Sequence, residues 1–280
     1  MLSNHTSDPI ESQLREEALY KPYQSLNAYL KKKYGEKIYK IALDGGFTCP
    51  NRDGTCGTRG CIFCSAGGSG EFATAIRQNS SIDAQIAQAL ARFGNKQTGQ
   101  RFIAYFQAYT GTYAAPERLY ALYHMALSHP KIIGISIATR PDCLPAPVLD
   151  VIKQCQMEFP DKFVWIELGL QSVHEKTALY IRRGYPLSCF EEALETLQTM
   201  SVPVIVHVIL GLPGETRADM LATIDYLSHK NIFGIKLQLL HVLRGTDLAA
   251  EYERGVFSCL SKEAYIDLLC SCIDHLNRPL

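Results

Sequence analysis

Six short apolar segments, rich in β-branched and aromatic residues, recur along the chain at intervals of roughly thirty residues, the length of one βαβ unit. Between them lie segments in which apolar residues repeat with the period of an amphipathic helix. We predict strands at 38–43, 102–106, 132–137, 163–168, 204–209 and 234–240. We predict helices at 81–93, 116–129, 144–157, 188–200, 215–229 and 261–276. Apolar strands that alternate with helices predict a parallel sheet covered by helices.

No linker rich in Gly, Ser or Pro separates these units, so we predict one core domain at 37–280, preceded by a helical N-terminal extension at 1–36. The fold class is α/β, and we expect a partial (β/α)6 barrel like an incomplete TIM barrel. A doubly wound sheet is the alternative. Either fold places chemistry in the loops that follow the carboxyl ends of the strands.

Composition excludes several classes of function. The chain has 28 basic and 28 acidic side chains and a formal net charge of zero, which argues against a generic nucleic-acid binder. Its first twenty residues are polar and contain no apolar signal segment, and no run approaches the roughly 20 apolar residues of a membrane helix. We therefore expect a cytoplasmic protein without membrane contact, whose cysteines are reduced.

Four of the ten cysteines lie in one Gly-rich loop after the first predicted strand. Cys61 and Cys64 form a C-x-x-C pair that lets both sulfurs face one metal centre, and Cys49 and Cys56 supply further thiolates. Two interpretations stay open at this point. Four thiolates would form a closed zinc site, whereas three thiolates on a four-iron cluster leave one iron free for a ligand.

The segment GGFTCPNRDGTCGTRGCIFC resembles the cluster loop of the radical S-adenosylmethionine (SAM) enzymes, and in particular their YhcC-like branch, which is related to the catalytic subunit of elongator. The resemblance continues, in order, through YFQAYTGTY, ATRPDC, ELGLQS, RRG, HVILGLPGET and KLQLLHVLRGT. It implies a barrel of the radical SAM type. It also implies that Cys49, Cys61 and Cys64 bind a [4Fe-4S] cluster, with Cys56 as an extra thiol that could serve as an alternative ligand.

The same resemblance assigns residues to SAM. Arg183 would pair with the SAM carboxylate, since its spacing from Gln171 matches that of relatives, and an arginine offers a fixed fork of donors. The other implied SAM contacts come from the cysteine loop and from the ends of four strands, and they are Phe63, Gln107, Tyr109, Thr110, Glu167, Gln171, Ser172, Gly211, Leu212 and Leu240. Glu167 stands out independently, because a carboxylate inside the apolar strand FVWIELGL is costly unless it is paired.

One departure weakens the analogy. Related families have Glu-Thr-Arg-Pro-Asp where this chain has Ala138-Thr139-Arg140-Pro141-Asp142, so a glutamate that contacts ribose or substrate in those relatives is absent. The side chains that we consider for contact with the substrate are Arg140, Asp142, His207 and His241.

The resemblance implies an enzyme that cleaves SAM reductively to a 5′-deoxyadenosyl radical, with one electron from a flavodoxin- or ferredoxin-type partner. The elongator relationship makes tRNA or another RNA one possible substrate, and a small metabolite is the alternative. A non-catalytic zinc- or iron-sulfur-binding protein is the competing hypothesis from a different class.

Overall fold

The computed structural model describes residues 22–68, 70, 81–93 and 99–276. Within these ranges one sheet has the strand order β1-β2-β3-β4-β5-β6, and all neighbouring strands are parallel. The strands are β1 (Tyr39–Leu43), β2 (Phe102–Phe106), β3 (Ile132–Thr139), β4 (Phe163–Gln171), β5 (Val204–Leu210) and β6 (Gly234–Leu239). A doubly wound sheet reverses its strand order at a switch point, and this sheet does not. The partial (β/α)6 barrel is confirmed, and the doubly wound alternative is wrong.

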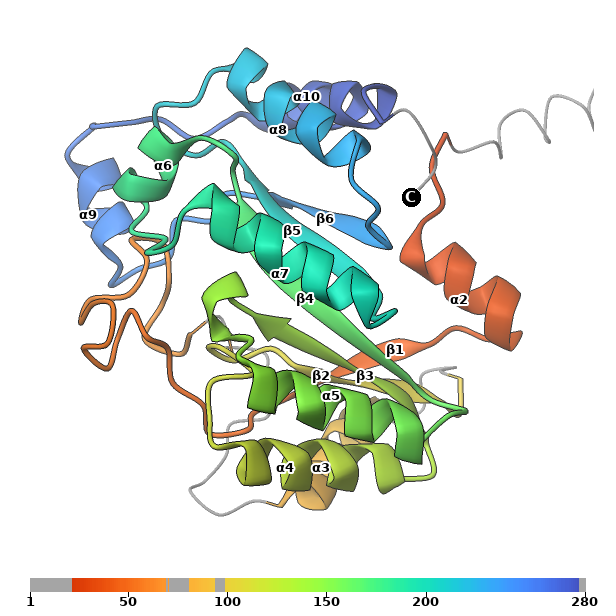
Figure 1. Cartoon of the computed structure of the whole chain (residues 1–280). Coiled ribbons are helices and arrows are strands. Elements are labelled where there is room, and N and C mark those ends of the chain that lie inside the picture. Colours follow the sequence, from red (N-terminus) through yellow and green to blue (C-terminus); the bar gives the residue numbers. More distant parts are fainter. Residues whose placement is uncertain (1–21, 69, 71–80, 94–98, 277–280) are drawn as a thin grey trace, which may run out of the picture.

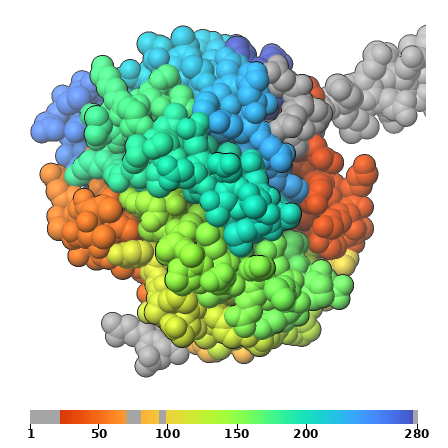
Figure 2. Space-filling view, in the orientation of Figure 1, coloured from red at the N-terminus to blue at the C-terminus, as the bar shows by residue number. Residues whose placement is uncertain are grey.

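Most of the helices cover the outer face of the curled sheet (Figure 1). Those that follow strands and were predicted from the sequence are α3 (Ile82–Phe93), α4 (Pro116–Ser128), α5 (Ala146–Glu158), α7 (Leu187–Thr199), α8 (Arg217–Ser228) and α10 (Lys262–Asp274). Three short elements were not predicted, namely η1 (Pro141–Cys143), α6 (Glu175–Tyr180) and α9 (Asp247–Glu253). In Figure 2 the outer helices form a continuous wall over the sheet.

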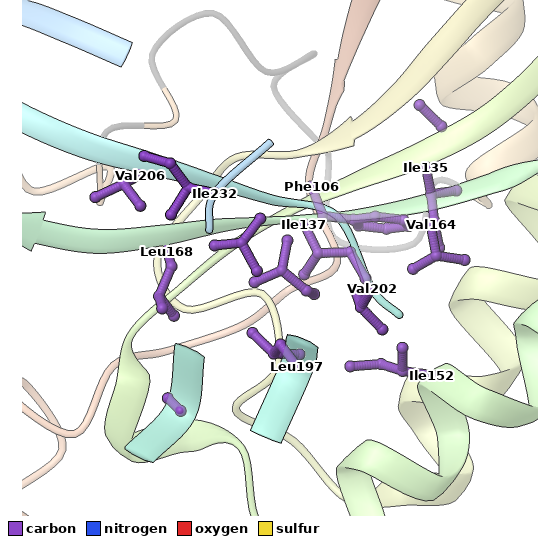
Figure 3. Packing of buried hydrophobic residues seen from close by; sticks show 14 of the residues in the cluster. Phe106, Ile135, Ile137, Ile152, Val164, Leu168, Leu197, Val202, Val206 and Ile232 are labelled. Carbon is purple, nitrogen blue, oxygen red and sulfur yellow. The ribbon is translucent and has the colours of Figure 1, made fainter. Parts of the chain in front are cut away.

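The main core lies between the sheet and these helices. Alternate strand residues such as Phe106, Ile137 and Leu168 point outward and pack against Ile152 of α5 and Leu197 of α7 (Figure 3). All of them are fully buried. Burial on this face fixes which strand residues remain for the barrel interior, because successive side chains alternate between the two faces of a sheet.

A second apolar cluster lies at the amino ends of the strands. The helix α2 (Leu26–Tyr34) lies there (Figure 1) and contributes Leu30, which packs with Ile103, Trp165 and Ile205 from the strands. This helix is the described part of the predicted N-terminal extension, and residues 1–21 of that extension lie outside the described residues. The helix α2 thus covers part of the amino end of the barrel, beside a second cavity of ≈ 560 Å³ that reaches Lys40, Glu167 and Lys236.

Next to this apolar cluster, toward the carboxyl ends of the strands, lies a layer of polar side chains, one from each of the six strands. We call it the polar layer, and it consists of Lys40, Tyr105, Ser136, Glu167, His207 and Lys236.

None of the helices in the described ranges has the length and apolarity needed to cross a membrane.

Candidate active site

The loop that follows β1 lies at the carboxyl end of the sheet, beside α6 and α9 (Figure 1). Its residues Cys49, Cys61 and Cys64 are half-buried and line one cavity of ≈ 510 Å³. Cys56 is exposed and does not line this cavity. A volume of this size is typical of a small-molecule site. The structure therefore brings the three predicted cluster ligands onto one cavity wall and leaves the fourth cysteine outside it.

Two side chains of the loop hold its shape around the cysteines. Asn51 is buried, and its Nδ2 donates to the Arg182 carbonyl at 2.7 Å and lies 3.5 Å from Cys61 Sγ. Arg52 Nη2 donates to the Cys64 carbonyl at 3.0 Å. The bond from Asn51 fastens the loop to the segment after α6, and the two side chains contact Cys61 and Cys64.

The burial and placement of the cysteine thiols indicate which metal group fits the loop. Burial and, to a smaller extent, the nearby Cys64 raise the pKa of the Cys61 thiol to about 11. A bound metal deprotonates a coordinating thiol outright, so metal binding here would release a proton. No three Cys, His, Asp or Glu side chains of the described residues converge on a single ion. A four-thiolate zinc site would also need Cys56, which is exposed and outside the cavity, whereas three thiolates suffice for a four-iron cluster, so the donor set fits a cluster better.

The segment after β2 forms the neighbouring wall of the cavity. Gln107, Tyr109 and Thr110 all line it, as does Phe63 of the cysteine loop. Tyr109 has a φ of 58° and its N–H donates to the Gly68 carbonyl at 2.8 Å. This segment therefore grips the cysteine loop while it lines the cavity, and the structure brings these four predicted residues together.

The end of β4 supplies Gln171, which has a φ of 67°, a left-handed conformation that is uncommon for a residue with a side chain. Gln171 lines the cavity, and its buried Oε1 has no hydrogen-bond partner among the described residues. Arg183 is 1% exposed and donates through Nη1 to the carbonyls of Leu170 at 3.1 Å and Ser172 at 2.7 Å. Arg183 also lines the cavity. The predicted SAM cation thus holds the backbone on both sides of Gln171.

Arg140 follows β3 and lies at the cysteine end of the cavity. It donates to the Asp142 carboxylate through Nε at 2.8 Å and Nη2 at 2.5 Å. Its Nη1 donates to the Arg183 carbonyl at 3.0 Å and lies 4.0 Å from Cys49 Sγ. Asp142 does not line the cavity, so its role in this structure is to orient Arg140.

Three other predicted residues stand behind the cavity wall. The Ser172 hydroxyl donates to the Glu215 carboxylate, and neither Ser172, Gly211 nor Leu212 lines the cavity. Leu212 belongs to an apolar cluster with Leu240, which does line the cavity. His241 lines it as well.

Glu167 lies deeper, at the centre of the polar layer. Its Oε1 accepts hydrogen bonds from Lys40 Nζ and, at 2.5 Å, from the Ser136 hydroxyl. Its Oε2 lies 2.6 Å from His207 Nε2 and 3.7 Å from Lys236 Nζ. The Glu167 side chain is fully buried, so its charge is matched by these partners and not by water.

The partners set the protonation of this cluster. Burial alone would raise the pKa of Glu167, but the hydrogen bond from His207 and the charges of Lys40 and Lys236 hold it well below its usual range. Burial lowers the pKa of His207 and outweighs the opposing effect of Glu167. At neutral pH the ring is therefore neutral and donates Nε2–H to the carboxylate, because an ionised carboxylate can only accept.

Comparison with known proteins decides the family. The model described as the radical SAM superfamily matches residues 54–227, which run from the cysteine loop into α8. The chain belongs to the radical SAM superfamily. A second model, described as the radical SAM C-terminal domain, matches residues 232–279. The predicted radical SAM membership is confirmed, and the chain is an iron-sulfur enzyme of this superfamily.

Relatives within the superfamily identify the branch. The chain is 41% identical to YtqA of Bacillus subtilis (strain 168) over 91% of its own length and 77% of that protein. It is 39% identical to YhcC of Escherichia coli (strain K12), over 84% of its length and 74% of YhcC. Elongator complex protein 3 of Danio rerio is 29% identical, over 51% of the chain and 25% of that protein. The YhcC-like branch and the weaker elongator relationship are confirmed.

Solved structures of superfamily members share the fold. The Elp3 of Methanocaldococcus infernus, with residues 1–46 deleted, aligns with a TM-score of 0.60 at 14% identity, over 84% of this chain and 53% of that one. Coproporphyrinogen III oxidase (HemN) of Escherichia coli aligns with a TM-score of 0.58 at 16% identity, over 94% of this chain and 60% of that one. At these identities the likeness establishes the partial barrel alone.

Sequence reasoning missed several residues of this radical SAM site. Lys40 and Lys236 carry charge inside apolar strands, and the argument that singled out Glu167 applies to both of them. Asn51 and Arg52 carried no comparable signal, because polar residues are ordinary in a loop. Tyr185 was also missed, although it lines the cavity and its ring lies 5.0 Å from the Arg140 guanidinium.

Proposed function

We propose that this chain generates a radical from SAM at a [4Fe-4S] cluster held by Cys49, Cys61 and Cys64. The single observation that carries the proposal is that these three thiols share a cavity with the unpartnered Oε1 of Gln171. When bound and reduced, the cluster would supply one electron that cleaves SAM to methionine and a 5′-deoxyadenosyl radical, which takes hydrogen from a substrate. A buried acceptor without a partner marks a place reserved for a donor group of a ligand.

The cavity walls offer each part of SAM a suitable surface. Gln107, Tyr109 and Thr110 would bind the methionine end beside the cysteines, and Gln171 would accept a hydrogen bond from a ribose hydroxyl. The described apolar residues that line the cavity and would cover the adenine are Phe63, Ile181, Ile209, Leu240 and Leu243.

Arg183 and Arg140 would act differently from one another. The donors of Arg183 are largely engaged by carbonyls, so its first role is to position Gln171, and the predicted contact with the SAM carboxylate would come from its remaining cavity-facing surface. Arg140 places a positive charge 4.0 Å from Cys49 Sγ, where it would offset the charge of bound thiolates.

The polypeptide would also keep water from the radical. The apolar cluster of α2 packs against the strands below the polar layer and would limit access from that side. The electron would come from a flavodoxin- or ferredoxin-type donor in the reducing cytoplasm.

The resemblance implies RNA as one possible substrate. Measuring the binding of tRNA at rising salt concentration tests it, since phosphate contacts weaken steeply with ionic strength.

The decisive experiment is anaerobic. The chain is loaded with iron and sulfide, reduced, and supplied with SAM, and 5′-deoxyadenosine is measured. We expect product from the wild type and from Cys56→Ser, and we expect loss of both the cluster absorbance and the product in Cys49→Ser, Cys61→Ser and Cys64→Ser. A preparation with one tightly bound zinc and no iron, or an intact cluster that leaves SAM uncleaved, contradicts the proposal.

A further inference from the structure

The polar layer carries more positive than negative charge. Lys40 and Lys236 come from the two edge strands of the sheet, and both face Glu167 of the central strand β4. The neutral His207 adds no charge. The layer therefore holds two ammonium groups against one carboxylate and keeps one net positive charge inside the barrel, where an unbalanced charge is costly.

The side chains of the layer differ in how far they are exposed. The Glu167 side chain is 0% exposed, whereas the side chains of Lys40 and Lys236 are 23% and 38% exposed. Of the two lysines, Lys236 lines the cavity that holds the three cysteines, as does Glu167, whereas Lys40 does not line it. The polar layer carries this net positive charge although the whole chain has a net charge of zero.

Lys236 is the less engaged of the two lysines. Its Nζ lies 3.7 Å from Glu167 Oε2 and 3.5 Å from the Tyr105 hydroxyl, so it makes no short contact with either. Lys236 lines the same cavity as the three cysteines, next to His207 and Gln238. Among the described residues that line this cavity, Glu167 is the sole acid. An ammonium with spare donors and no second acid nearby is suited to bind an anion.

We propose that the polar layer binds a carboxylate of the substrate, with Lys236 as the pairing ammonium. This inference rests on the proposed function, because it assumes that the substrate is held in the barrel. A single carboxylate matches the one net positive charge of the layer. A phosphate, with roughly one and a half to two negative charges near neutral pH, would leave an excess of negative charge in the barrel.

The carboxylate of SAM is a poorer candidate for this position. Lys236 lies within strand β6, whereas the cysteines lie in a loop beyond the end of β1. The arginines that line the cavity and are bonded to the cysteine loop or to the segment after α6 are Arg52 and Arg140. The two ends of the cavity therefore offer separate cations, one set for the cofactor and one for the substrate.

The test follows the Lys236 side chain directly. Lysines of the cluster-loaded, oxidised protein are reductively methylated with ¹³C-formaldehyde, which keeps their charge, and the Lys236 signal is assigned with Lys236→Arg. Acetate is then titrated at constant ionic strength, with chloride as the balancing anion. We expect a saturable shift of the Lys236 signal and no shift for Lys153, an exposed lysine of α5. In Lys40→Met we expect the acetate affinity to fall several-fold.

Three results would overturn the inference. They are a Lys236 signal that responds to acetate no more than Lys153 does, inorganic phosphate that binds more tightly than acetate, and SAM alone that saturates the Lys236 response. The titration uses the wild-type chain and needs no catalysis. The 5′-deoxyadenosine assay on the same preparation reports separately whether the proposed function fails.

Discussion

Gln171 combines two costs at one residue, a left-handed backbone and a buried oxygen without a partner. Strained residues persist where the surroundings hold them, and they concentrate at functional sites. Here the surroundings are the two bonds from Arg183 to the carbonyls of Leu170 and Ser172. The buried Arg183 thus maintains a conformation that the chain would not adopt locally.

This geometry predicts that Gln171→Leu separates stability from ligand binding. Removing a buried, unsatisfied acceptor should leave the free energy of unfolding unchanged or raise it by about 1–3 kcal/mol. Loss of the hydrogen bond to ribose should raise the Kd for SAM about tenfold. Urea unfolding and equilibrium SAM binding check the two effects. A destabilised variant with unchanged SAM affinity would show that Gln171 is structural.

Glu167→Gln tests the ion cluster of the polar layer. Two cations would lose their buried counter-charge, and removing one partner of a buried ion pair costs about 3–5 kcal/mol. Glu191→Gln is the control, because the pair of Glu191 with Lys230 is half-exposed, and such surface pairs contribute less than about 1 kcal/mol. Urea unfolding measures both variants. Equal losses in the free energy of unfolding would contradict the assignment of Glu167 to a buried ion cluster.

The same substitution has a defined pH dependence. The pKa of Glu167 in the folded chain lies well below its ordinary value of 4.5. Its stabilising contribution is therefore complete above about pH 4.5 and is lost as the pH falls through the folded pKa. We expect the stability gap between wild type and Glu167→Gln to narrow as the pH falls below 4.5. Urea titrations between pH 3 and 7 measure it, and a gap that widens toward low pH would refute the argument.

At the scale of elements, the cysteine loop depends on its contact with the segment after β2. Gly68 has a φ of +60°, and a Cβ there would lie 2.4 Å from the Tyr109 ring. Gly54 of the same loop has a φ of +96°, and a Cβ there would meet nothing within 4 Å. The two glycines share the backbone constraint and differ in their surroundings.

We therefore expect Gly68→Ala and Gly54→Ala to differ in function. Both should cost about 1 kcal/mol or more in stability, because alanine is strained at a positive φ. Only Gly68→Ala should displace Tyr109 from the cavity wall, and we expect it to lower 5′-deoxyadenosine formation about tenfold or more while Gly54→Ala keeps near-normal activity. Equal activity in the two variants would show that the Tyr109 contact is dispensable.

At the scale of the whole molecule, the partial barrel leaves β1 and β6 as edge strands. The interior strand β2 is buried at every position, whereas every residue of β6 is half-buried. Charges from the two edges meet on Glu167 across the barrel, and these contacts join strands that are far apart in the sheet. The polar layer therefore contributes to the curvature of the sheet as well as to the cavity.

This arrangement predicts a gradient of hydrogen exchange. Amides of β2 to β5 should exchange slowest, because they lie between covered faces and paired neighbours, and those of β6 should exchange about tenfold faster or more. Mass spectrometry of peptides from each strand measures the difference. Exchange of β6 as slow as that of β4 would show that its open edge is covered.

Much of the fold could be predicted from the amino-acid sequence. The spacing of the six strands predicted the barrel, and the strand and helix positions agree with the structure to within a few residues. The short helices α6 and α9 were missed, because a stretch of six or seven residues is too short for a reliable helical period. The three cysteines proposed to bind the cluster stood out because they lie close together in one loop and match the ligand spacing of the family.

What the sequence alone determined is therefore what depends on local order, namely the alternation of strands and helices and the spacing of the thiols in one loop. The tertiary structure decided which charges meet in the polar layer, that Arg183 supports Gln171, and that Ser172 and Leu212 stand behind the cavity wall. Those contacts depend on the curl of the sheet and on the register between distant strands. No single segment contains that information, because burial and charge pairing are properties of the closed barrel.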